Sequence, residues 1–235
     1  MMTQVLEPIV YVFFDLDGTL TDPREGIVRG LKYALAELGH SSPTDTELER
    51  YIGPPLQDSF VSLLNSSEAD LIQQAVSLYR RHFSSEGMFA NAVYPGIENA
   101  LAELQEQGLV LYVVTSKPTV FARQILAHLS LSSFFHNTYG SELDGTRSSK
   151  EELIASVLAE ESVPAGSTIM VGDREHDVRG AILNGVTPVG VLWGYGSRQE
   201  LRGAGASLLC ESPESLVEVL SSNLALERMR LTQHR

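Results

Sequence analysis

The sequence holds a single cysteine, Cys210, and few basic side chains: 17 lysines and arginines against 30 acidic residues, a formal net charge of −13. One cysteine excludes an internal disulfide and a thiolate metal cluster, so we expect a reducing, cytoplasmic location. The acidic balance argues against binding to nucleic-acid polymers or anionic membranes, because both require basic patches. It does not exclude a small anionic substrate, since a bound cation and a few N–H groups can reverse the local field.

Long apolar runs are also missing, and none approaches the roughly 20 residues that a membrane-spanning helix needs. The first residues lack the basic start and apolar stretch of a signal peptide. Repeats, low-complexity tracts and heptad runs are absent. The 235 residues, 43% of them hydrophobic, suffice for one large core or for a core with a smaller second unit.

Strand-like apolar segments alternate with segments of helical periodicity over most of the chain. The strand-like segments are Ile9–Phe14, Leu109–Val114, Ser133–Tyr139, Thr168–Val171, Pro188–Leu192 and Ser207–Cys210. The helical segments are Ile97–Gln107, Thr119–Ser130, Lys150–Glu160, Asp177–Asn184, Arg198–Gly203 and Pro213–Asn223. This alternation predicts βαβ units and a mostly parallel sheet covered by helices on both faces. In such sheets ligands bind beyond the carboxyl ends of the strands.

One long interruption separates the first strand from the next βα unit. Its residues show no convincing strand and have helical patterns over roughly 23–38, Asp45–Tyr51, Leu56–Leu64 and Ala69–Ser84. A helix start is visible at "DPRE" (22–25), with Asp22 as the N-cap. We therefore expect an α/β core domain of residues 1–21 and 94–235 that carries an inserted helical cap of residues 22–93. An insertion at this point would lie above the active end of the sheet, like a lid.

Two carboxylates stand where the first apolar segment ends, in "FFDLDGTLTD" (13–22). Asp15 and Asp17 would share one side of an extended strand, and Gly18 would let the main chain approach a ligand closely. Carboxylates at the carboxyl end of a strand suit a hard cation such as Mg²⁺. Two loop-capping aspartates are the structural alternative.

A second apolar segment runs into aspartates in "IMVGDREHDV" (169–178). Asp173 and Asp177 are four residues apart, a spacing that stacks both carboxylates on one side of a helix start. Acidic residues also stabilise the first turn of a helix, which accounts for part of Asp177. If the two strand ends are adjacent in the sheet, Asp15, Asp17 and this pair form one acidic pocket that only a cation could neutralise.

Hydroxyl groups follow a third strand-like segment, in "LYVVTSKP" (111–118). Thr115 and Ser116 stand at its tip, before a helix that Pro118 opens. Exposed hydroxyls and free N–H groups at a helix N-terminus form an anion site. Capping of the helix by Ser or Thr explains the same pattern.

Lys150 stands at the expected start of another helix. Ser149 followed by Glu152 forms a capping-box pattern, which places Lys150 in the first turn. The helix dipole mildly disfavours a cation there, so the lysine hints at an anion nearby. Arg147 is the competing candidate for the same role, and a solvated side chain is the plain alternative for both.

In their order along the chain, these motifs resemble those of the haloacid dehalogenase (HAD) superfamily of phosphohydrolases, in the group with a helical (C1) cap after the first motif. "DLDGTLT" matches the first motif, Thr115 the second, Lys150 the third and "GDREHD" the fourth. The resemblance covers nearly the whole chain. "DGTLTD", "VGD" with its later aspartate, and "GVLWGYGS" (190–197) resemble in particular the branch of phosphoglycolate phosphatases and 5′-nucleotidases. The implied fold is an α/β, Rossmann-like parallel sheet with an inserted cap.

The resemblance implies a Mg²⁺-dependent phosphomonoesterase that hydrolyses small phosphate esters through an aspartyl-phosphate. Asp15 would be the nucleophile, and Asp17 the general acid for the leaving oxygen and then the general base for water. Mg²⁺ would be held by the carboxylates of Asp15 and Asp173 and by the main-chain carbonyl of Asp17, with Asp177 in support. The implied substrate-binding residues are Thr115, Ser116, Lys150 and Gly18.

Several alternatives stay open. Asp17 favours phosphoryl transfer over dehalogenation, because dehalogenases lack the second aspartate of this motif. The substrate is a phosphoglycolate-type ester, with Arg24, Arg50 and Arg174 as candidates for its carboxylate, or else a nucleoside 5′-monophosphate. A phosphosugar mutase and a non-catalytic phosphate-binding protein are the alternatives from other classes. The oligomeric state is not predicted.

Four further features receive no assigned role. Arg174 replaces the small residue common in the fourth motif, and it places a cation near the pocket or is an exposed helix-start arginine. His176 faces the site or lies there by chance. The "YIGPPL" loop (51–56) touches substrate or is an interhelical turn. Trp193 and Tyr195 stack on a nucleobase or plug the last loop of the sheet. The end of the chain, residues 224–235, is expected to be a polar, frayed tail.

Overall fold

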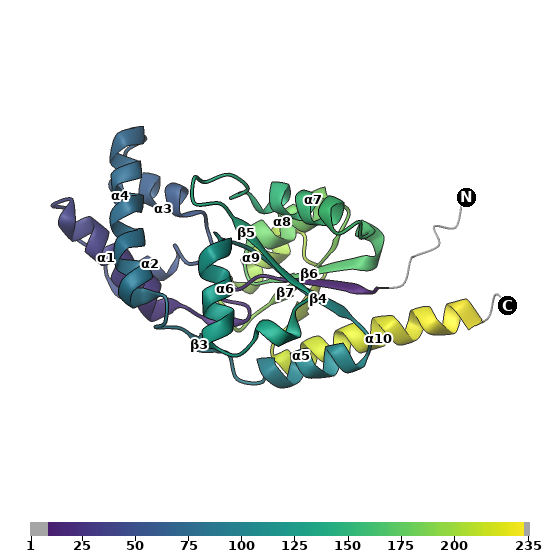
Figure 1. Ribbon diagram of the computed structural model, residues 1–235. Coiled ribbons are helices and arrows are strands. Elements are labelled where there is room, and N and C mark those ends of the chain that lie inside the picture. Colours follow the sequence, from purple (N-terminus) through teal and green to yellow (C-terminus); the bar gives the residue numbers. More distant parts are fainter. Residues whose placement is uncertain (1–8, 233–235) are drawn as a thin grey trace.

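A six-stranded sheet forms the centre of the molecule. The computed structural model describes residues 9–232, and from residue 223 only their main chain (Figure 1). The strands are β1 (Tyr11–Phe14), β4 (Val110–Pro118), β5 (Asn137–Ser141), β6 (Thr168–Gly172), β7 (Thr187–Val191) and β8 (Leu208–Cys210). They lie in the order β5-β4-β1-β6-β7-β8, and every neighbouring pair is parallel. The predicted α/β class is therefore confirmed.

Helices cover both faces of this sheet. They are α5 (Ile97–Glu106), α6 (Thr119–His128), α7 (Lys150–Glu160), α8 (Glu175–Leu183), α9 (Arg198–Ala204) and α10 (Pro213–Thr232). Successive side chains of β1 point to opposite faces. Val12 and Phe14 join an apolar cluster that includes Ile125 of α6, whereas Phe13 joins a second cluster with Leu153 of α7. Because both faces are buried, the central strands are almost continuously apolar.

The register of the sheet decides where the site lies. β1 pairs with both β4 and β6, and its last residue, Phe14, stands opposite Val113 and Val171. The residues that follow in each strand therefore emerge at one edge, the carboxyl edge at which ligands bind in open α/β sheets. Because β1 and β6 are neighbours, their two aspartate-bearing ends are adjacent, as a single acidic pocket requires.

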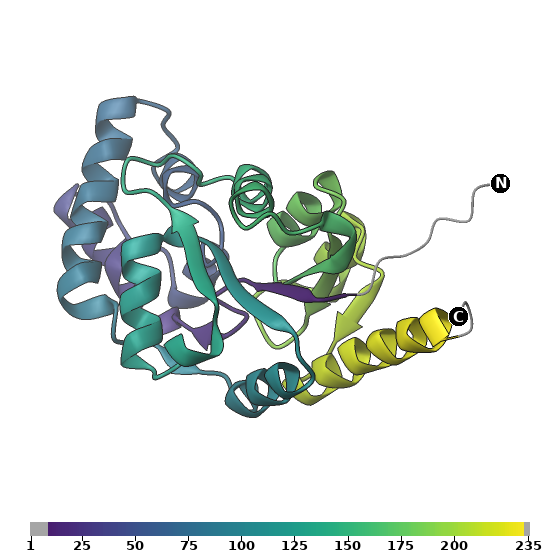
Figure 2. The same cartoon turned by 45° about the vertical axis from the view of Figure 1, so that its right-hand side comes forward.

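Four helices gather beyond this edge, in purple and blue at the left of Figures 1 and 2. They are α1 (Arg24–Glu37), α2 (Asp45–Glu49), α3 (Leu56–Leu64) and α4 (Ala69–His82), and a π-helical turn (Phe83–Gly87) follows. Their buried residues, among them Leu31 and Phe60, belong to the same apolar cluster as Val12 and Phe14. This helical layer is therefore packed against the sheet, at the carboxyl edge of its strands. Within residues 9–232, no helix has the length and apolar character that crossing a bilayer requires.

Two short strands join the helical layer to the rest of the chain. β2 (Thr21–Asp22) and β3 (Ala92–Val93) pair antiparallel, with Thr21 opposite Val93. The expectation of no strand within 22–93 is therefore wrong at its two ends. Two-residue strands carry no periodicity, and this pairing forms only because the entry and exit of the layer meet in space.

Other element boundaries differ from the prediction for local reasons. The strand expected at Ser133–Tyr139 begins only at Asn137, because a 3₁₀ turn (Ser132–Phe134) first leads the chain out of α6. Its apolar residues pack instead of pairing, and Phe135 is buried in the core. The final helix α10 continues to Thr232 where a frayed tail was expected, which agrees with the good helix formers Leu, Ala, Glu and Arg in that stretch. The remaining residues 233–235 of that expected tail lie outside the described part.

The predicted helix caps also need correction. The N-cap of α1 is Pro23 rather than Asp22, although the Asp22 carboxylate accepts a hydrogen bond from the Arg24 N–H at 3.0 Å. Ser149 is the N-cap of α7, as its position predicts, but its side chain makes no capping hydrogen bond. The capping box expected there is absent.

Candidate functional site

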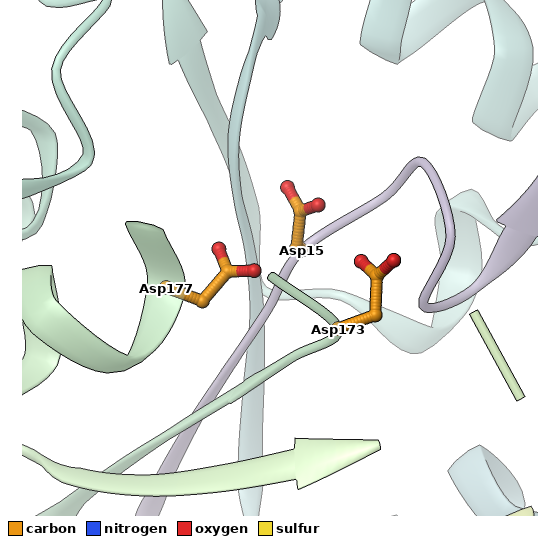
Figure 3. A group of neighbouring side chains, drawn as sticks. All are labelled: Asp15, Asp173 and Asp177. Carbon is orange, nitrogen blue, oxygen red and sulfur yellow. The ribbon is translucent and has the colours of Figure 1, made fainter. Parts of the chain in front are cut away.

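Three strand ends bring buried polar side chains together. Asp15 follows β1, Asp173 follows β6, and Asp177 lies in the first turn of α8. All three are at least 97% buried, and one carboxylate oxygen of each lies within 4.8 Å of the others. Figure 3 shows the three carboxylates pointing into one space. Thr115, in β4, is also buried and lines the same cavity as Asp15.

Lys150 lies at the centre of this group. Its Nζ is 2.7 Å from Oδ1 of Asp15 and 2.8 Å from Oδ1 of Asp177, and it donates to the Val114 carbonyl at 2.9 Å. Burial alone lowers the pKa of Lys150, but the two carboxylates raise it above its ordinary value. The ammonium is therefore held charged. The competing candidate Arg147 pairs with Glu142 and Glu160 instead.

The acidic group still carries more negative charge than Lys150 can balance. Burial, together with the charges of Asp177 and Asp15, raises the pKa of Asp173 well above its usual range. The Asp173 oxygens accept hydrogen bonds from the Thr19 hydroxyl at 3.2 Å and from the Tyr195 N–H at 2.8 Å. Buried carboxylate oxygens with surplus negative charge are the donor set that Mg²⁺ prefers. The residues present therefore fit that ion.

Gly18 shapes the floor of this acidic group. Its φ is +86°, a left-handed conformation that favours glycine, and a Cβ there would lie 2.7 Å from Cγ of Asp173. The glycine thus lets the loop after β1 pack directly against the Asp173 carboxylate. Gly18 was predicted to allow close approach of a ligand, and here it allows close approach of an aspartate.

Asp17 is not one of the three clustered aspartates and pairs with Lys117. Its Oδ2 lies 2.5 Å from the Lys117 Nζ, and the side chains are 10% and 6% exposed. Burial raises the pKa of Asp17, and Lys117 opposes part of that rise. Lys117 is not among the predicted site residues. The signal for it is only its place directly after Thr115 and Ser116, because β4 is irregular between Thr115 and Pro118 and the alternation of faces fails there.

A cavity of about 70 Å³ opens beside Asp15 and Asp17, between the sheet edge and the helical layer. From the sheet side it is lined by Thr115, Ser116, Lys117, Pro118, Phe121, Ser141, Glu142, Gly145 and Ser148. From the helical layer it is lined by Ile27, Tyr51, Gly53, Pro54, Pro55, Leu56, Gln57, Tyr79, Arg80 and Phe83. The structure thus places most of the 51–56 loop in the cavity wall and not in a remote turn.

The arginines proposed for a substrate carboxylate lie outside this cavity. Arg24 pairs with Glu49 at 2.5 Å and is half exposed, and Arg50 stacks on the Tyr51 ring. The cations that do line the cavity are Lys117 and Arg80. Lys117 lies 4.7 Å from the centre of the Phe83 ring. Arg80 donates to the main-chain carbonyl of Leu143, and its buried Nε has no hydrogen-bond partner in the described part of the chain.

The remaining candidates have structural partners or face water. The Trp193 indole donates to the Thr19 carbonyl at 2.9 Å, and the Tyr195 hydroxyl donates to Asp22. Neither ring lines the cavity, which favours the plug over the nucleobase platform. Their bonds tie the loop after β7 to the segment after β1. His176 is exposed on α8 and does not line the cavity.

Comparisons with known proteins agree with this geometry. The model of the haloacid dehalogenase-like hydrolases matches residues 12–191. A 5′-nucleotidase of Pseudomonas aeruginosa is 47% identical over 212 residues, 90% of this chain and 96% of that protein. The tyrosine-protein kinase PtkA of Mycobacterium tuberculosis is 38% identical, over 79% of this chain and 62% of that protein. A phosphoglycolate phosphatase of Aliivibrio fischeri is 24% identical, over 92% of this chain and 99% of that protein.

A solved structure has the same fold. A predicted phosphatase from Clostridium acetobutylicum superposes with a TM-score of 0.89 and is 41% identical, over 92% of this chain and all of that one. The family match spans most of the chain, and it includes both strands that end in the buried aspartates. The chain therefore belongs to the haloacid dehalogenase-like hydrolase family and is a phosphatase of that family.

Proposed function

We propose that this phosphatase is a Mg²⁺-dependent phosphomonoesterase that hydrolyses small phosphate esters through an aspartyl-phosphate. The observation that carries the proposal is the position of Asp15. Its buried carboxylate is held by Lys150 at 2.7 Å and borders a cavity that also exposes Thr115 and Ser116. A fixed carboxylate beside hydroxyl donors is suited to attack on a phosphoryl group.

In the first step, an Asp15 oxygen forms a bond to phosphorus while the bond from phosphorus to the ester oxygen breaks. Asp17 gives its proton to that leaving oxygen. In the second step, Asp17 takes a proton from water, the water oxygen bonds to phosphorus, and Asp15 leaves as a carboxylate. Burial keeps the pKa of Asp17 raised, which favours the protonated form that the first step needs.

The phosphoryl oxygens need positive partners throughout. We assign Lys150 and the hydroxyls of Thr115 and Ser116 to them, with Gly18 shaping the loop beneath. Mg²⁺ would be held by the carboxylates of Asp15 and Asp173 and by the main-chain carbonyl of Asp17, with Asp177 in support, and it would neutralise charge on the phosphoryl group. We also propose that residues 22–93 act as a cap on a core of residues 1–21 and 94–235, and exclude water from the closed site.

Two substrate classes have support. The two cations Lys117 and Arg80 in the cavity wall favour a small ester with a second anionic group, of the phosphoglycolate type. The 47% identical relative named 5′-nucleotidase favours a nucleoside 5′-monophosphate, and Tyr79, Phe83 and Phe121 would offer aromatic walls to a base.

The test is phosphate release from 2-phosphoglycolate, nucleoside 5′-monophosphates, sugar phosphates and pyrophosphate. Each assay is run with Mg²⁺, with a chelator, and with the Asp15→Asn variant. Asp70→Asn, which changes an exposed aspartate of α4, is the matched control. We expect release that requires both Mg²⁺ and Asp15 and is unchanged in the control, and the best ester then identifies the substrate class.

Other outcomes would replace the proposal. Isomerisation of a phosphosugar without net phosphate release would indicate a mutase. Ligand binding without turnover and without a need for Mg²⁺ would indicate a phosphate-binding protein. A protein that neither binds Mg²⁺ nor turns over any ester would contradict the proposed mechanism.

A further inference from the structure

Arg174 is next to Asp173 in the sequence, but its side chain contacts the helical layer. It is the N-cap residue of α8, between Asp173 and Asp177, and its side chain is 12% exposed. The guanidinium NH1 donates to the main-chain carbonyl of Ile52 at 2.5 Å and lies 3.4 Å from that of Arg50. A side chain from the sheet end of the molecule thus contacts the main chain of the helical layer.

Glu200 of α9 orients this arginine. Its Oε1 accepts from the Arg174 Nε at 2.8 Å and from the Glu175 N–H at 3.0 Å. Burial raises the pKa of Glu200, but these donors more than offset it and lower the pKa below its ordinary value. The carboxylate is therefore ionised and fixed by two helices. Because a guanidinium is a planar fork, fixing Nε also fixes the direction in which NH1 points.

The loop that Arg174 contacts forms part of the cavity wall. Tyr51, Gly53, Pro54, Pro55 and Leu56 all line the cavity. Gly53 has a φ of +102°, and a Cβ there would lie 2.9 Å from Cγ of Arg174. Glycine at this position lets the loop pack directly on the arginine stem. This part of the cavity wall is therefore in contact with the side chain of Arg174, the residue that follows Asp173 in the sequence.

We propose that Arg174 is a positioning residue for the substrate: it holds the 50–53 turn against the sheet end, so that residues 51–56 close the cavity over the ester. The kinetic part of this inference rests on the proposed phosphatase function, and the contact itself does not. The arginine acts through the loop and not on the phosphoryl group, since its Nε and NH1 are bound by Glu200 and the two carbonyls and it does not line the cavity.

Three variants test this inference against a matched control. Arg174→Ala removes the fork, Arg174→Lys keeps the charge without the fork, and Glu200→Gln weakens its orientation. Arg198→Ala is the control, because Arg198 also begins a helix and pairs with an acidic residue, Glu211, but is 55% exposed. The measurements are hydrogen exchange over residues 50–57 and steady-state kinetics on the best ester of the panel.

The amides of Tyr51 and Ile52 are the reporters, since they donate to the Leu48 and Glu49 carbonyls within this turn. For Arg174→Ala we expect at least tenfold faster exchange there, and a KM raised about fivefold or more with kcat changed less than twofold. Glu200→Gln should give a smaller change of the same kind, Arg174→Lys should restore part of the KM, and Arg198→Ala should match the wild type.

Unchanged exchange and KM in Arg174→Ala would overturn the inference. So would a loss of kcat at unchanged KM, which would place the effect at Asp173 and Asp177. If Arg174→Ala does not fold, Glu200→Gln decides by the same criteria. If the wild-type protein hydrolyses no ester, the proposed function fails, while the exchange data still decide whether Arg174 holds the turn.

Discussion

At the scale of single residues, Lys117 is the side chain that links the proposed acid–base residue to the helical layer. Its ammonium lies 2.5 Å from Asp17 and 4.7 Å from the centre of the Phe83 ring. An opposite charge within about 4–6 Å lowers the pKa of a carboxyl group, typically by one to three units. Lys117 therefore limits how far burial can raise the pKa of Asp17.

Replacing Lys117 with methionine should shift the pH dependence of the proposed reaction. Without the cation the pKa of Asp17 rises further, so Asp17 stays protonated to a higher pH and the second step loses its base. We expect the activity optimum to move up by about one pH unit and kcat near neutral pH to fall at least tenfold. Lys117→Arg keeps the charge and should stay close to the wild type. If the methionine variant has the same pH profile as the wild type, Lys117 does not control the pKa of Asp17.

At the scale of elements, apolar residues that recur with a strand or a helix period predict most of the sheet and its helices. They predict that Asp15 and Asp173 meet only on the condition that their strands are neighbours, because adjacent parallel strands end at a common edge. The strand order that meets this condition comes from the structure. These patterns do not predict the Lys117–Asp17 pair, because β4 is irregular between Thr115 and Pro118, or the contact of Arg174 with Ile52, because Ile52 comes from the helical layer. How one layer sits on another depends on side-chain packing between distant segments, which no local period records.

The helical layer should be as sensitive to packing as the sheet. Phe60 of α3 is fully buried and meets the Tyr79 ring edge-to-face, whereas its neighbour Val61 is 40% exposed. Phe60→Ala should lower the free energy of unfolding by about 3–5 kcal/mol, and Val61→Ala by less than about 1 kcal/mol, measured by urea denaturation. Equal, small effects of both variants would show that α3 does not pack as described.

At the scale of the whole molecule, the cavity of this acidic chain is lined by charges of both signs, the carboxylates of Asp15, Asp17 and Glu142 and two cations. The chain carries a net charge of −13, yet Lys117 and Arg80 line the cavity and Lys150 lies buried beside it. An anionic ester therefore meets cations once it has entered, although the surface as a whole repels it. Increasing salt should weaken both effects, because it screens the charges.

Asp173→Asn should raise the stability of the metal-free protein and weaken Mg²⁺ binding. The raised pKa of Asp173 means that the folded state binds its proton more tightly than the unfolded state, so its ionisation destabilises the metal-free protein as the pH rises. In chelator at pH 7 the asparagine variant should unfold at a higher temperature than the wild type, and this gap should narrow towards pH 4.

Added Mg²⁺ should reverse that order. At 100 times its dissociation constant it should stabilise the wild type by about 2.7 kcal/mol and the asparagine variant far less. Thermal unfolding followed by circular dichroism measures both effects. A variant that is less stable than the wild type in chelator, or equally stabilised by Mg²⁺, would contradict this account of the acidic group.

The central place of β1 in the sheet has a consequence for biosynthesis. Strand β1 (Tyr11–Phe14) is made well before its two partners, which lie at residues 110–118 and 168–172. Its apolar side chains therefore have neither neighbour until β4 ends at Pro118, and they lack β6 until Gly172 has been made. Such late pairing slows folding and leaves an aggregation-prone segment exposed. We expect β1 to need chaperone protection while the chain is being made, more than a strand whose partner follows it directly in the sequence.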